Sequence, residues 1–141
     1  MGRLMGLDVG ERRIGVAMSG PSGLLASPLT TLARRTQEKD LATVLKLAEE
    51  EGAEAVVVGV PYSLSGTLGP QGEKVMAFVQ ALRARSAVPV DTWDERLSTF
   101  EAERLLRQAG RKPSREKARA DAAAAAVILQ SYLDSLRKRM G

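Results

Sequence analysis

The segment Ala55–Val60 constrains the fold of this 141-residue chain more than any other. Its sequence, Ala-Val-Val-Val-Gly-Val, has the length of a β-strand and contains no polar side chain. A strand that is apolar on both faces has to be covered on both faces, and this is typical of sheets flanked by helices. Pro61 ends the run. The sequence therefore predicts an α/β protein.

Three short β-prone runs precede this strand, at residues 4–9, 14–18 and 24–31. Glycine-containing turns separate the three runs, which is typical of β-hairpins. Another run of strand type follows at residues 88–93. We therefore expect five strands.

Apolar residues at helical spacing predict helices between and after these strands. The first helix is bounded by an N-cap at Thr36 and a terminating Gly52, and the second begins near Pro70. Ser98 and Glu101 form a capping-box pattern at the start of the third. A final helix is expected from about residue 116 to about residue 139.

The predicted order of elements is βββαβαβαα. Hairpins come first and crossover connections later, so the order predicts a mixed sheet with antiparallel strands at the start and parallel strands afterwards. The length suits one compact domain, and we expect a single domain over residues 1–141.

The chain contains no Cys and no His, and its 21 Lys and Arg against 17 Asp and Glu give a net charge of +4. These absences exclude a catalytic cysteine, a Ser-His-Asp triad and a Cys/His zinc site. Any chemistry has to use carboxylates, hydroxyls, Lys, Arg, backbone amides or a cofactor. The mild basic excess is compatible with a polyanionic partner.

No secretory signal is visible in the sequence, and the longest apolar run, residues 122–129, is far shorter than the roughly 20 residues of a membrane helix. We therefore expect a cytoplasmic protein.

Three acidic residues lie beside apolar positions. Asp8 is near the end of the first strand, Glu95 follows the strand at 88–93, and Asp121 shares a helical stripe with Ala125. Other interpretations stay open: Asp8 can terminate its strand, Glu95 can pair within a charged loop, and Asp121 can stabilise a helix N-terminus.

Together, the three acids favour a metal site. Carboxylate oxygens select hard cations such as Mg²⁺ or Mn²⁺. Two such ions about 3.5 to 4 Å apart would hold the attacking and leaving oxygens of a phosphodiester. The pattern therefore indicates a metal-dependent phosphodiesterase.

Four blocks of sequence resemble the signature blocks of the bacterial YqgF (RuvX) family. They lie at residues 6–17, 57–61, 94–102 and 121–130, and the likeness covers essentially the whole chain. The resemblance implies an RNase H-like fold with a five-stranded mixed sheet flanked by helices. It also implies a metal-dependent nuclease site in which Asp8, Glu95 and Asp121 match the family's acidic positions.

The resemblance implies maturation of the 5′ end of pre-16S ribosomal RNA, with the resolution of Holliday junctions as the alternative. Its partner would be structured RNA or branched DNA, bound by a monomer or a homodimer. The sequence departs from the family pattern at Gly20 and at Ser65, and neither departure touches the three acids.

Basic residues near these acids are candidates for binding phosphate. They are Arg12, Arg13, Arg96, Arg111, Lys112 and Arg115. Each also has an ordinary interpretation, as a solvated surface charge or, for Arg96, as the partner of Asp94 or Glu95. Loop 63–69 can bind phosphate or simply be flexible, and the aromatic residues Tyr62, Trp93 and Tyr132 can stack on bases or pack in the core.

Two further hypotheses come from other classes. One is a nucleic-acid-binding factor without turnover. The other is a nucleotide binder of the actin or sugar-kinase type, which the length of 141 residues disfavours because that class needs two such domains.

Overall fold

The computed structural model describes residues 2–97 and 115–140, except for the side chains of residues 115–119 and 140. Five strands form one sheet in the order β3-β2-β1-β4-β5. The strands are β1 (Leu4–Val9), β2 (Arg13–Ser19), β3 (Ala26–Ala33), β4 (Ala55–Val60) and β5 (Val90–Asp94). The β1–β2 and β2–β3 pairs are antiparallel, whereas the β1–β4 and β4–β5 pairs are parallel. The predicted mixed sheet is confirmed.

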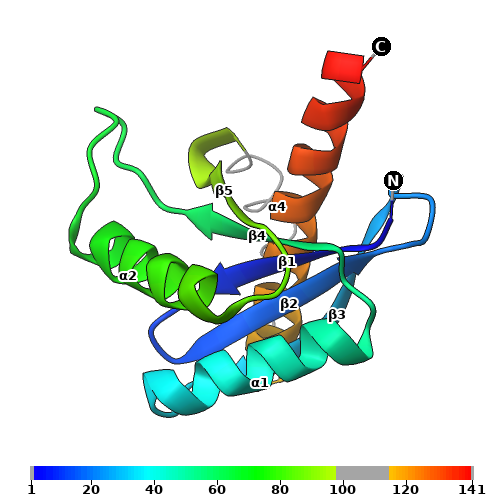
Figure 1. The fold of residues 1–141 in the computed structure, drawn as a ribbon. Helices are drawn as coiled ribbons and strands as arrows, with labels where there is room; N and C mark the ends of the chain where they lie inside the picture. Colours follow the sequence, from blue (N-terminus) through cyan, green and yellow to red (C-terminus); the bar gives the residue numbers. More distant parts are fainter. Residues whose placement is uncertain (1, 98–114, 141) are drawn as a thin grey trace.

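Helices cover both faces of the sheet (Figure 1). Helices α1 (Gln37–Glu50) and α2 (Pro70–Arg85) pack on one face, and α4 (Arg115–Met140) packs on the other. A short 3₁₀ helix, η1 (Glu95–Leu97), follows β5. None of the helices described is long and apolar enough to cross a membrane.

Both ends of α1 and the start of α2 are those that the sequence predicts. The Thr36 hydroxyl accepts a hydrogen bond from the Lys39 amide at 3.2 Å, and this caps α1. Gly52 follows α1 with φ of +67°, a left-handed conformation that suits glycine. Pro70 occupies the first turn of α2, where its missing N–H costs nothing.

Two predicted strands begin later than expected. The turn after β2 continues to Leu25, whose carbonyl accepts from the Gly20 amide at 3.1 Å, so β3 begins at Ala26. The Ser86 hydroxyl accepts from the Val88 amide at 3.1 Å, which keeps Val88 in a turn before β5. The helix predicted after Ser98 lies outside the described residues.

The sheet and α4 approach each other closely at three glycines. A Cβ on Gly15 would lie 2.0 Å from the carbonyl oxygen of Asp121, and one on Gly6 would lie 2.7 Å from the Cβ of Leu129. A Cβ on Gly59 would lie 2.5 Å from Cδ1 of Ile128 in α4. Glycine in a strand interior permits this approach. The three glycines therefore fix the position of α4, and with it that of Asp121.

Candidate active site

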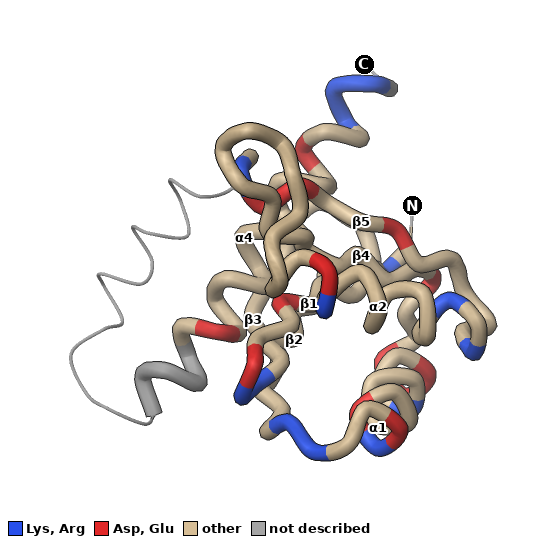
Figure 2. The backbone as a smooth tube through the Cα atoms, turned by 90° about the vertical axis from the view of Figure 1, so that its left-hand side faces the viewer, with Lys and Arg blue, Asp and Glu red and all other residues tan. Residues whose placement is uncertain are grey.

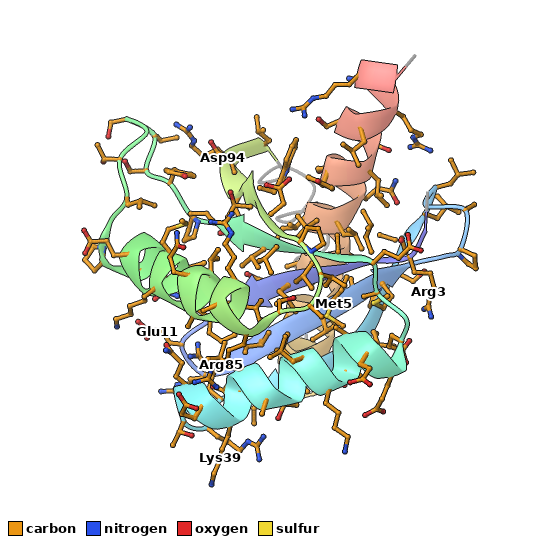
Figure 3. The ribbon with its side chains drawn as sticks, viewed as in Figure 1. Arg3, Met5, Glu11, Lys39, Arg85 and Asp94 are labelled. Atoms are coloured by element: carbon orange, nitrogen blue, oxygen red, sulfur yellow. The ribbon has the colours of Figure 1, made fainter. Side chains whose placement is uncertain are left out.

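Asp8 and Glu95 meet at the edge of the sheet where β1, β4 and β5 end. Asp8 lies on the α4 face of β1, because side chains alternate along the strand and those of Leu7 and Val9 pack beneath α1 and α2. Glu95 follows β5 in η1, and its Cγ lies 3.0 Å from the position a Cβ on Gly59 would take. Figure 3 labels the neighbouring Asp94 at this end of β5. The structure thus brings together two of the three predicted acids.

These two carboxyl groups are hydrogen-bonded to each other, with Glu95 as the donor. Burial, followed by the Asp8 charge, the hydrogen bond to Asp8 and the Asp94 charge, raises the pKa of Glu95 to about 8. Burial also raises the pKa of Asp8; the hydrogen bond from Glu95 lowers that pKa, and the charge of Asp121 raises it. Both residues are partly buried, and two carboxyl groups so close together disfavour the state in which both are charged.

Asp121 lies near this pair but faces a different partner. Its charge acts on Asp8, while its Oδ2 accepts a hydrogen bond from Nε of Arg13 at 2.7 Å. Within residues 2–97 and 115–140, no three acidic side chains are grouped as a metal cluster would require. Asp121 is therefore adjacent to the Asp8–Glu95 pair and held beside it by Arg13.

The donor atoms available here fit a hard divalent cation. They are carboxylate oxygens only, which is the set that Mg²⁺ and Mn²⁺ prefer. The raised pKa values of Asp8 and Glu95 indicate that positive charge nearby would stabilise the ionised pair, and a divalent cation supplies such charge. The chemistry of Asp8, Glu95 and Asp121 is thus compatible with holding a metal.

Arg96 is paired with Asp94, and its binding of phosphate stays a prediction. Its Nη2 and Nε donate to Oδ2 of Asp94 at 2.5 and 3.0 Å, and its Nη1 donates to the Ser63 carbonyl at 3.3 Å. Its guanidinium lies over the ring of Tyr62, 5.5 Å from the centroid. These contacts hold the pKa of Asp94 below its usual value. Arg96 therefore ties loop 63–69 to the end of β5.

The other predicted phosphate ligands stay predictions. Arg12 is exposed in the turn before β2. Figure 2 shows acidic and basic segments of the backbone around this end of the sheet. Arg115 begins α4, but its side chain is not described, and Arg111 and Lys112 lie outside the described residues. In loop 63–69 the hydroxyls of Ser63, Ser65 and Thr67 bond to one another.

The aromatic side chains pack with the core. Trp93 and Tyr132 meet edge to face, with ring centroids 5.9 Å apart, against the α4 side of the sheet. Tyr62 packs against the core cluster on the other side. The structure therefore supports the packing interpretation of these residues.

Two features of the site were not predicted from sequence. One is the pair formed by Arg13 and Asp121, for which no pattern gives a signal because the two residues are far apart in the chain. The other is the close approach of Gly15 to Asp121. The available sequence signal for this approach was glycine inside a predicted strand, as at Gly6 and Gly15, because such a glycine often marks a site where another backbone comes close.

Solved structures of Holliday junction resolvases share this fold. The RuvC of T. thermophilus in complex with a Holliday junction substrate matches with a TM-score of 0.62 at 20% identity, over 100% of this chain and 97% of that one. A fowlpox virus resolvase in complex with Holliday junction DNA matches with a TM-score of 0.56 at 10% identity, over 95% of this chain and 98% of that one. The fold of this chain is the RNase H-like fold that these resolvases share.

The RuvX family model, described as Holliday junction resolvase, matches residues 2–135, and the chain belongs to that family. Two bacterial relatives are named "Putative pre-16S rRNA nuclease". The one from Desulforudis audaxviator (strain MP104C) is 51% identical over 94% of each chain. The one from Thermoanaerobacter pseudethanolicus (strain ATCC 33223 / 39E) is 44% identical over 97% of this chain and 99% of its own. The chain is a nuclease that binds nucleic acid, and nucleases of this kind generally depend on a divalent metal.

Proposed function

We propose that this chain cleaves pre-16S ribosomal RNA during maturation of its 5′ end. The observation that carries the proposal is the partly buried Asp8–Glu95 pair at the carboxyl ends of parallel strands, with Asp121 of α4 beside it. The names of the relatives support the substrate. In this proposal the chain acts in the cytoplasm as a single RNase H-like domain over residues 1–141.

Asp8, Glu95 and Asp121 hold the metal in this proposal, as Mg²⁺ or Mn²⁺ and as two ions. When bound, such a cation would polarise the phosphodiester and stabilise the charge that develops on it. Burial, with the Asp8 charge second, raises the pKa of Glu95 to about 8, and a cation held there would keep Glu95 as a carboxylate, its proton passing to solvent. Asp8 accepts the hydrogen bond from Glu95 until then.

The basic residues bind the RNA backbone in this proposal. Arg12, Arg13 and Arg96 lie on the elements next to the acids, and residues 111, 112 and 115 precede or begin α4. Binding through phosphates releases counterions, so the logarithm of RNA affinity falls linearly with the logarithm of salt concentration. Reversing the charges of Arg111 and Lys112 is expected to reduce that slope. An unchanged slope would remove both residues from the RNA-binding surface.

The test of the proposed function is cleavage of a 5′-extended ribosomal RNA precursor. Asp8→Asn and Glu95→Gln each replace a carboxyl group by an amide of nearly the same size and so remove a carboxylate ligand, and each is expected to lower kcat by roughly 100-fold or more. Glu49→Gln is the matched control, because Glu49 is exposed near the end of α1. EDTA is expected to abolish cleavage. Activity of Asp8→Asn equal to that of wild type would refute the proposed mechanism.

A second candidate substrate is a branched DNA junction, which the description of the family model favours. Cleavage of a four-way junction is measured in the same assay, and sedimentation gives the oligomeric state, since symmetric cutting of two strands needs a dimer. RNA binding that survives Asp8→Asn, with no metal-dependent cleavage of either substrate, would instead indicate a binding factor without turnover.

A further inference from the structure

Arg13 and Gly15 lie two residues apart on the same face of β2, and both contact Asp121. Gly15 admits the Asp121 backbone, whose carbonyl oxygen would lie 2.0 Å from a Cβ at position 15. Arg13 contacts the side chain, with Nε 2.7 Å from Oδ2. One strand thus fixes both the place of Asp121 and the direction of its carboxylate.

The oxygen that accepts from Arg13 belongs to the group that the proposed function assigns to a metal. The same lone pairs serve either as hydrogen-bond acceptors for a guanidinium or as ligands for a cation. The side chains of Arg13 and Asp121 are 34% and 31% exposed, and an ion pair with this much access to water is weak. A divalent cation binding at Asp121 therefore has only a weak partner to displace.

We propose that Arg13 is a positioning residue that competes with the divalent cation for Asp121 and, once displaced, turns to the substrate phosphate. The inference rests on the proposed function, because it takes Asp121 as a metal ligand. Before the cation binds, Arg13 keeps the Asp121 carboxylate beside Asp8. After the cation binds, the freed guanidinium can donate in a fork to phosphate oxygens.

The competition predicts that removing Arg13 has opposite effects on metal affinity and on RNA cleavage. Removing Arg13 removes the competitor, so the metal binds more tightly. It also removes the phosphate ligand, so kcat/KM for RNA falls. A residue that only stabilises the fold would weaken both properties when it is replaced.

The test is isothermal titration of the full-length chain with Mn²⁺ alone. Arg13→Gln is expected to lower the Kd for Mn²⁺ between about twofold and fivefold, the range that an exposed ion pair contributes. Arg12→Gln is the matched control, since it removes the same charge from the adjacent, exposed position and is expected to change the Kd less. Arg13→Lys, which keeps a charge without the fork, is expected to lie between wild type and Arg13→Gln.

Two results would overturn the inference. One is a Kd for Mn²⁺ of Arg13→Gln that is equal to or higher than that of Arg12→Gln, since the loss of one positive charge from the chain would then explain any change. The other is kcat/KM for RNA unchanged in Arg13→Gln, since it would deny Arg13 a role towards phosphate.

The failure of the proposed function gives a different pattern. It would appear as wild-type protein that binds Mn²⁺ but cleaves no RNA. In that case tighter Mn²⁺ binding by Arg13→Gln would still support the competition at Asp121. Cleavage of RNA by wild type, combined with unchanged Mn²⁺ binding by Arg13→Gln, would refute the inference and leave the function standing.

Discussion

Gly15→Ala is expected to displace α4 from the sheet. The added Cβ would lie 2.0 Å from the Asp121 carbonyl oxygen, 2.4 Å from its carbonyl carbon and 3.0 Å from the Ala122 amide nitrogen. All three atoms belong to the helix backbone, so no side-chain rotation relieves the overlap. Ordinary contact begins at 3.4 Å, and α4 therefore has to retreat by more than 1 Å at this point.

The expected cost is at the upper end of the range for overpacking, about 3 kcal/mol. For a domain of this size that loss lowers Tm by roughly 10 °C. A displacement of about 1 Å at a catalytic group can also reduce the rate about 100-fold, so RNA cleavage should fall along with stability. Cleavage is measured at a temperature where circular dichroism shows the variant to be folded.

Gly20→Ala is the matched control. A Cβ there meets nothing within 4 Å, and the φ of Gly20 is not in the left-handed region. Urea denaturation of both variants gives the two free energies of unfolding. If Gly15→Ala lay within about 0.5 kcal/mol of Gly20→Ala, the close contact between β2 and α4 would be refuted.

Three further predictions concern pH and packing. Burial and the hydrogen bond to Asp91 raise the pKa of Tyr132 to about 12. The neutral tyrosine therefore makes its full contribution to the free energy of unfolding below pH 10, and this contribution is lost as the pH rises from 10 to 12. Asp91→Asn should lower the pKa, seen as earlier tyrosinate absorbance, and an unshifted titration would exclude Asp91 as a cause. Ser19→Ala should cost about 1 to 3 kcal/mol in urea denaturation, because the buried Leu4 amide loses its acceptor at 2.8 Å. Phe78→Ala should cost about 3 to 5 kcal/mol in the same assay, because it empties a fully buried site; a loss below 1 kcal/mol would show that the core collapses around it.

The sheet could be predicted from sequence because its signals are local. The apolar run at Ala55–Val60, the Gly-containing turns and the cap at Thr36 each act over a few residues, and the structure confirms the elements that they predict. Strands β3 and β5 begin two residues later than predicted, because hydrogen bonds at Leu25 and Val88 extend the turns before them. Such bonds depend on three-dimensional placement, which composition does not show.

The candidate site was predictable only in its residue types. The apolar stripe that contains Asp121 indicated that this side of α4 faces the sheet, and Ala125, Ile128 and Leu129 of that stripe pack in the core there. The sequence could not show that Glu95 donates to Asp8 while Asp121 turns to Arg13. Both contacts join elements far apart in the chain, and no periodic pattern encodes them.

The position of α4 has a consequence for synthesis of the protein. Asp8 comes from the first strand made, and Asp121 from the helix that closes the opposite face of the sheet. While the chain is still emerging from a ribosome, the early strands can pair and bury their α1 and α2 face before this helix exists. Under the proposed function the site is complete only when α4 docks, so a growing chain would carry no nuclease site next to the RNA of the ribosome that makes it.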